Sequence, residues 1–132
     1  MSGDFFDTNV ILYLLDASPK ADTAERLLQS GGVISTQVLN EALVNCIRKA
    51  DMSWAEAGEF LGGIRAICEV HDLTVDVHDA GRALGERYGF SVYDSMIVAA
   101  ALVSGCSRIY SEDMQDGLLV EGALRIVNPF AG

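Results

Sequence analysis

The sequence has little of what marks disordered, disulfide-bonded or membrane-spanning chains. Only two of its residues are proline while 50% are hydrophobic, a composition that predicts a folded core. Its three cysteines, Cys46, Cys68 and Cys106, lie far apart with no C-x-x-C motif, which predicts reduced thiols. The longest apolar run, 96–103, is much shorter than the roughly 20 residues that cross a bilayer. We therefore expect a folded domain with no membrane span.

Basic residues are also scarce. Nine Lys and Arg residues face 19 Asp and Glu residues, for a net charge of −10. This balance argues against a protein that holds nucleic acid with its whole surface, and it fits a basic partner or a local acidic metal site. The only histidines, His71 and His78, fit no zinc-ligand spacing. The chain opens without a basic segment and reaches Asp4 at once, so we expect no signal peptide and a cytoplasmic location.

Short apolar segments alternate with helical patterns along the chain. Strands are predicted at 5–6, 33–34, 68–71, 108–110 and 124–127. Helices are predicted around 10–15 and at 21–30, 37–49, 53–67, 77–88 and 93–104. This alternation predicts one α/β domain over residues 1–132, with a mainly parallel sheet of about five strands covered on both faces. In such sheets the working site lies beyond the carboxyl ends of the strands, where the strand order reverses.

Two acidic residues lie close to that edge in the first third of the chain. Asp7 directly follows the strand at 5–6, where its alternative role is the N-cap of the next helix. Glu41 lies about two turns into the helix at 37–49, off its apolar stripe and in a row with Gln37 and Asn45. A solvated helix face is the alternative interpretation of Glu41.

Three later acids are placed in the same way. Asp94 precedes the apolar positions 97, 98 and 101 by three, four and seven residues, so it projects from the buried face of its helix. A capping box with Ser91 is the alternative. Asp113 follows the strand at 108–110, and Asp116 comes three residues later, in a segment that is also rich in turn formers.

Carboxylates that converge on one cleft repel each other and need a cation. Because the set contains oxygen donors and neither His nor Cys, it favours Mg²⁺ or Mn²⁺. A metal that is held by carboxylates and keeps open coordination positions can promote phosphodiester hydrolysis.

Four segments carry a family resemblance. They are FDTNVILY at 6–13, STQVLNE at 35–41, YDSMIVAAA at 93–101 and YSEDMQDG at 110–117. In this order and spacing they resemble the PIN-domain family, and most of all its small ribonuclease toxins of the VapC type. The resemblance implies a three-layer α/β/α PIN-like domain and a Mg²⁺- or Mn²⁺-dependent endoribonuclease.

The resemblance also implies roles for individual residues. The catalytic acids would be Asp7, Glu41, Asp94 and Asp113. The metal ligands would be Asp7, Asp94 and Asp113, oriented by Thr8, Asn9 and Ser111. Many family members carry two acids two residues apart followed by Phe, whereas Asp113 and Asp116 here are three apart and Gly117 follows. Asp116 is therefore a possible additional acid.

The implied partners are RNA, a second copy of the chain, and an antitoxin that presents basic residues to the acidic cleft. Two other classes stay open. One is an α/β phosphate-handling enzyme of the receiver or phosphatase type, although a receiver needs a late lysine and the only lysines are Lys20 and Lys49. The other is a non-catalytic PIN-like binding module.

Overall fold

The computed structural model describes residues 3–131 and arranges their strands in one sheet with the order β3-β2-β1-β4-β6-β5. The strands are β1 (Asp4–Phe6), β2 (Gly32–Ser35), β3 (Cys68–His71), β4 (Arg108–Tyr110), β5 (Leu119–Val120) and β6 (Leu124–Val127). All neighbouring strands run parallel except β5, which is antiparallel to β6. The mainly parallel α/β sheet is thus confirmed, and β5 is an addition to the five expected strands. This edge strand has only two residues, and the apolar run that contains it, 118–120, is too short to distinguish a strand from a loop.

The helices match the sequence pattern to within a few residues. They are α1 (Thr8–Leu12), the 3₁₀ turn η1 (Tyr13–Leu15), α2 (Pro19–Leu28), α3 (Thr36–Arg48), α4 (Trp54–Ile67), α5 (Val75–Tyr88) and α6 (Val92–Val103). Helix α4 begins with a capping box, in which Ser53 and Glu56 each accept a hydrogen bond from the other's backbone N–H. The first predicted helix tightens into a 3₁₀ turn at Tyr13.

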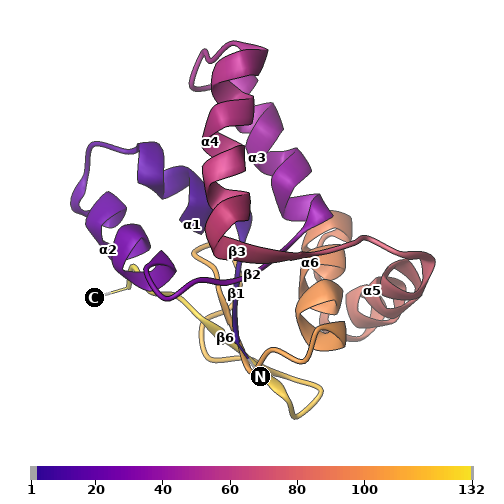
Figure 1. The fold of residues 1–132 in the computed structure, drawn as a ribbon. Coiled ribbons are helices and arrows are strands. Elements are labelled where there is room, and N and C mark those ends of the chain that lie inside the picture. The colour runs from indigo at the N-terminus through magenta and orange to yellow at the C-terminus, as the bar shows by residue number, and fades with distance from the viewer. Residues whose placement is uncertain (1–2, 132) are drawn as a thin grey trace.

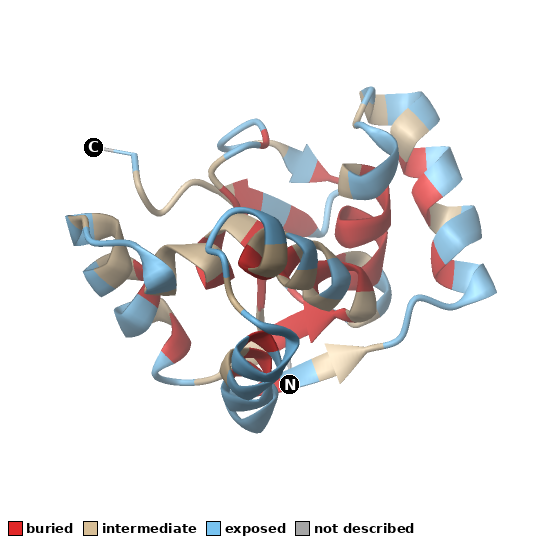
Figure 2. Cartoon of the chain, turned by 90° about the horizontal axis from the view of Figure 1, so that it is seen from above, coloured by how far each residue is buried: buried red, intermediate tan, exposed pale blue. Residues whose placement is uncertain are grey.

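The helices enclose the sheet in layers. Figure 1 shows α1 and α2 on one side of the strands, α5 and α6 on the other, and the paired helices α3 and α4 above them. Buried residues gather in the central strands and the helix beside them, whereas the outer helices are largely exposed (Figure 2). Helix α6 is buried continuously from Ser95 to Ala101. No described helix between residues 3 and 131 has the length and hydrophobicity of a membrane span.

Two adjacent glycines let the first two strands approach each other. Gly31 ends the turn after α2 with a φ of 76°, a conformation that favours glycine. A Cβ at Gly32 would lie 2.1 Å from a ring carbon of Phe6, so only glycine leaves room for that buried ring. The glycine pair therefore both ends the turn after α2 and allows the close contact between β1 and β2.

The strand order reverses beside β1. From β1 the chain builds outward first to β2 and β3, and later, on the other side, to β4 and β6. Phe6 pairs with Tyr110 in register, and their rings stack with centroids 5.7 Å apart. The residues that follow β1 and β4 consequently meet at the switch point where α/β sheets bind ligands.

Candidate active site

Asp7, the residue after β1, is a buried carboxylate with only 3% of its surface exposed. Its Oδ1 accepts a 2.7 Å hydrogen bond from the N–H of Thr8, so it does cap α1. Its Oδ2 accepts a 2.6 Å bond from the hydroxyl of Ser111. Burial raises the pKa of Asp7 to about 6 against the lowering effect of these bonds, and the charges of Asp94 and Glu41 raise it further. Asp7 therefore both caps α1 and carries a carboxylate that is costly to ionise because it is buried.

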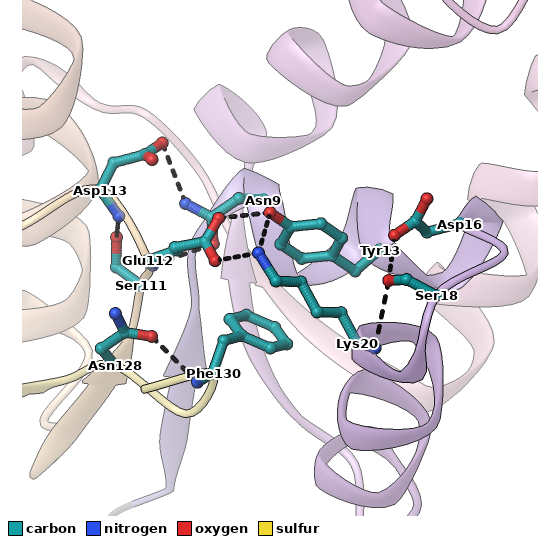
Figure 3. Close-up of polar contacts among 10 residues, drawn as sticks. All are labelled: Asn9, Tyr13, Asp16, Ser18, Lys20, Ser111, Glu112, Asp113, Asn128 and Phe130. Atoms are coloured by element: carbon teal, nitrogen blue, oxygen red, sulfur yellow. Dashed lines mark hydrogen bonds and ion pairs between the residues drawn. The ribbon is translucent and has the colours of Figure 1, made fainter. Parts of the chain in front are cut away.

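Asn9 and Ser111 connect the segments after β1 and β4. The amide of Asn9 donates to Asp113 at 3.1 Å and, more weakly, to Asp7 at 3.4 Å. Its carbonyl oxygen accepts from the N–H of Glu112 at 3.2 Å. Ser111 also accepts from the N–H of Asp113 at 3.3 Å, as Figure 3 shows. These bonds determine where Asp7 and Asp113 lie relative to each other.

Glu41 faces the same cleft from α3. Its Oε1 accepts from the Thr8 hydroxyl at 3.2 Å, and its Oε2 accepts from the Gln37 amide at 2.8 Å. Asn45, one turn further on, donates its side-chain amide to the backbone carbonyl of Glu41. The row formed by Gln37, Glu41 and Asn45 is therefore turned inward, and the alternative of a solvated face does not describe it.

Asp94 lies in the first turn of α6 and is half-buried. Burial raises its pKa, the Ser91 side chain lowers it, and the charges of Glu41 and Asp113 raise it. Ser91 caps the helix by accepting from the N–H of Asp94 at 3.2 Å. The capping interaction is therefore present, and the charges of two other acids of the cleft also act on the Asp94 carboxylate.

The structure separates the two late acids. Asp113 lines the cleft. Asp116 instead accepts a 2.8 Å hydrogen bond from the N–H of Asn128 and thereby holds the chain after β6. It is not among the described residues that line the cleft.

The cleft between α1 and α3 has a volume of about 670 Å³. One wall is formed by Thr8, Asn9, Leu12, Tyr13, Leu15 and Asp16. The other is formed by Glu41, Asn45, Lys49 and Ala50. The remaining lining residues are Asp7, Asp94, Glu112 and Asp113. The four acids expected from the sequence thus share one cleft with two more, Asp16 and Glu112.

The donor atoms that these side chains offer are oxygens, the ligand type that suits Mg²⁺ and Mn²⁺. As the side chains lie within residues 3–131, however, no three Asp, Glu, His or Cys residues converge closely enough to hold a metal ion. The donor chemistry of the set therefore matches such an ion, although its side chains would have to move together to hold one.

A polar network at the rim of the cleft was not expected from the sequence. Glu112 accepts hydrogen bonds from the Tyr13 hydroxyl and, at 2.6 Å, from the Lys20 ammonium (Figure 3). The ammonium also lies 4.8 Å from the centroid of the Tyr13 ring, which packs edge-on against Phe130 at 4.7 Å. The hydrogen bonds with Glu112 and Tyr13 raise the pKa of Lys20 to about 12, and the bonds from Lys20 and Tyr13 lower the pKa of Glu112. The network anchors the residue next to Asp113.

One signal in the sequence could have found part of this network. Tyr13 follows Asn9 by four residues, so a continuous helix would place both on one face. Nothing local links Lys20 or Phe130 to Glu112, which is 92 residues from Lys20. That contact depends on tertiary packing alone.

Comparison with known proteins gives a consistent fold. Residues 5–115 match the family model described as PIN domain. No curated protein matches the sequence.

Solved structures agree along most of the chain. A toxin-antitoxin complex from Klebsiella pneumoniae aligns with a TM-score of 0.75 and 18% identity, covering 96% of this chain and 98% of that one. The DNA-bound VapBC of Salmonella typhimurium aligns with a TM-score of 0.67 and 22% identity over 96% and 97% of the two chains. VapC20 of Mycobacterium tuberculosis, a sarcin-ricin loop cleaving toxin, aligns with a TM-score of 0.66 and 20% identity over 80% and 86%.

These neighbours share the fold at low identity, and the family model spans most of the chain, including β1, α3, α6 and β4 with the residues that follow them. The chain belongs to the PIN domain family.

Proposed function

We propose that this protein is a Mg²⁺- or Mn²⁺-dependent endoribonuclease that acts in the cytoplasm as the toxin of a toxin-antitoxin pair. The observation that carries the proposal is the meeting of Asp7, Glu41, Asp94 and Asp113 in one cleft at the switch point of the sheet. These acids come from four separate stretches of the chain, and the pKa of Asp7 and of Asp94 is raised. Such a cluster of perturbed carboxylates is typical of a functional site.

In the proposal Asp7, Asp94 and Asp113 hold the metal and Glu41 completes the acidic cluster. When bound, the metal would supply an activated water and neutralise charge on the scissile phosphate. Ser111 and Asn9 keep Asp7 and Asp113 oriented through the hydrogen bonds described above, and Thr8 does the same for Glu41. Within residues 3–131 no three of these acids stand close enough to hold a metal as they lie, so binding would require their side chains to move together.

The proposed partners follow from charge and fold. Neighbours of similar fold are described as toxin-antitoxin complexes, which supports a cognate antitoxin here. An antitoxin that inserts Arg or Lys into a cleft lined by six acids would be bound by charge-assisted hydrogen bonds. We also propose a homodimer, as the family resemblance implies.

The direct test is RNA cleavage by purified protein with Mg²⁺, with Mn²⁺ and with EDTA. Cleavage should require the metal and should fall by at least about 100-fold in Asp7→Asn and Asp94→Asn, because each removes charge where the metal would bind. Asp116→Asn is the matched control, since Asp116 lies outside the cleft and should leave the rate unchanged. Cleavage that survives both EDTA and Asp94→Asn would contradict the proposal.

One observation favours a second function, a non-catalytic binding module. Among residues 3–131 no three potential ligands stand close enough to hold a metal without movement. Calorimetric titration with Mn²⁺ separates the two functions, because a binding module would take up no metal while the nuclease would bind it through Asp7 and Asp94. The receiver and phosphatase classes are set aside because the chain belongs to the PIN domain family.

A further inference from the structure

Among the described residues that line the acidic cleft, Lys49 is the only cation. Six carboxylates line the same cleft: Asp7, Asp16, Glu41, Asp94, Glu112 and Asp113. A chain with a net charge of −10 repels RNA, so one cation inside the cleft weighs heavily in how an RNA strand could enter.

The ammonium of Lys49 also has no partner among residues 3–131. Within residues 3–131 no carboxylate lies within ion-pair distance of its ammonium, and its side chain makes no hydrogen bond. Lys20, the other lysine near the cleft, is engaged by both Glu112 and Tyr13. Lys49 is exposed and free to meet an anion that enters from solvent.

The position of Lys49 relative to the acids is set by α3. Glu41, Asn45 and Lys49 are spaced four residues apart and all line the cleft, so one helix face carries an acid near the sheet and a cation further out. Eight residues at about 1.5 Å each separate Glu41 from Lys49 by roughly 12 Å.

We propose that Lys49 binds a backbone phosphate of the RNA strand and thereby positions that strand over the acids at the base of the cleft. This inference rests on the proposed ribonuclease function. A lysine ammonium is a mobile point charge suited to a phosphate oxygen, and contacts of this kind determine register without reading the base. Lys49 is a positioning residue in this sense.

The competing interpretation is purely structural. Lys49 is the C-cap residue of α3, where a positive charge interacts favourably with the helix dipole. Arg48 precedes it at the same helix end and is exposed, but it does not line the cleft. A dipole effect is shared by Arg48 and Lys49, whereas a phosphate contact in the cleft belongs to Lys49.

The test uses the full chain with Asp7→Asn as background, so that RNA is not consumed. Binding of a fluorescein-labelled single-stranded RNA is followed by anisotropy at fixed Mg²⁺ across a range of KCl concentrations. Lys49→Gln should weaken binding about three- to tenfold and reduce the slope of log K against log salt by about 0.7, the value for one phosphate contact in a single strand. Lys49→Arg should restore both, and Arg48→Gln should change neither.

The outcomes separate this inference from the proposed function. Equal slopes for Lys49→Gln and Arg48→Gln would overturn the assignment of Lys49, even if the wild type cleaves RNA. A slope that depends on Lys49 in a protein that never cleaves RNA would uphold the contact and overturn the nuclease. Failure of the Asp7→Asn protein to bind RNA at all would overturn the role of Lys49.

Discussion

The hydroxyl of Ser111 donates a 2.6 Å hydrogen bond to Oδ2 of Asp7 and so joins the residue after β4 to the residue after β1. The two strands are neighbours, and the bond lies at the point where the strand order reverses. It lowers the pKa of Asp7, yet burial outweighs it and leaves the pKa at about 6. The central acid of the cleft is therefore held in place by its neighbours but is costly to ionise.

That cost predicts how stability changes with pH. Below the usual Asp pKa of about 4 both the folded and unfolded chains are protonated at Asp7, and no penalty exists. As pH rises towards 6 the unfolded chain ionises first, so the free energy of unfolding falls, and above about 6 the penalty is complete. In the absence of metal, Asp7→Asn should therefore stabilise the protein at pH 7.5 by on the order of 2 kcal/mol and give little gain near pH 4.

Urea unfolding of wild type and variant in EDTA at both pH values measures this difference. Ser111→Ala is the informative companion, because loss of its bond raises the pKa of Asp7 further and should destabilise the protein more at pH 7.5 than near pH 4. If Asp7→Asn destabilised the protein equally at both pH values, the buried carboxylate would not be the source of the penalty.

A divalent cation in the cleft should offset this cost of ionising Asp7, together with the smaller repulsion from Asp94 and Glu41. Mg²⁺ or Mn²⁺ at about ten times its dissociation constant should stabilise the folded chain by roughly 1.4 kcal/mol, which raises the melting temperature by about 4 °C. The increase in melting temperature should be lost in Asp94→Asn and kept in Asp116→Asn, since Asp94 lines the cleft and Asp116 does not. Thermal melts across a metal titration report this, and an equal shift in all three proteins would place metal binding elsewhere.

The sequence predicted the fold and the cleft acids by periodicity and by position at strand ends. Asp7 and Asp113 follow buried strands, so their meeting needed only the rule for the carboxyl edge of a parallel sheet. The role of Glu41 was harder to predict, because a row of polar residues along a helix has the same sequence pattern whether it faces solvent or a site. Only the packing of α3 against α1 decides between the two. Asp116 could not be separated from Asp113, since its bond to Asn128 joins two loops that have no periodic signal.

The contact between Lys20 and Glu112 predicts an effect on catalysis. Lys20→Met leaves Glu112 without its cation and loosens the segment that presents Asp113 to the cleft. A displacement of this kind should lower kcat by up to about tenfold with little change in RNA affinity, because geometry and not binding is lost. Lys20→Arg should recover most of the rate. Steady-state kinetics with Mn²⁺ separates the effect on kcat from the effect on KM. A rise in KM alone would instead assign Lys20 to RNA binding.

Helix α5 packs closely on α6, the helix that carries Asp94. A Cβ at Gly81 would lie 2.7 Å from the sulfur and 3.0 Å from the terminal carbon of buried Met96, two residues after Asp94. Gly81→Ala should cost about 1–3 kcal/mol of stability, because the end of the buried Met96 side chain must repack and the Ser95 carbonyl oxygen lies only 3.3 Å away. Because Asp94 directly precedes Ser95, RNA cleavage should also fall.

Gly58→Ala on α4 is the matched control for this substitution. Beyond the backbone of its own helix and its two chain neighbours, no described atom would lie within 4 Å of its Cβ. The higher helix propensity of alanine should therefore stabilise the protein by about 0.5–1 kcal/mol with unchanged cleavage. Urea unfolding and cleavage rates of the two variants give the comparison. If Gly81→Ala were as stable as Gly58→Ala and fully active, the close approach of α5 to α6 would have no part in placing Asp94.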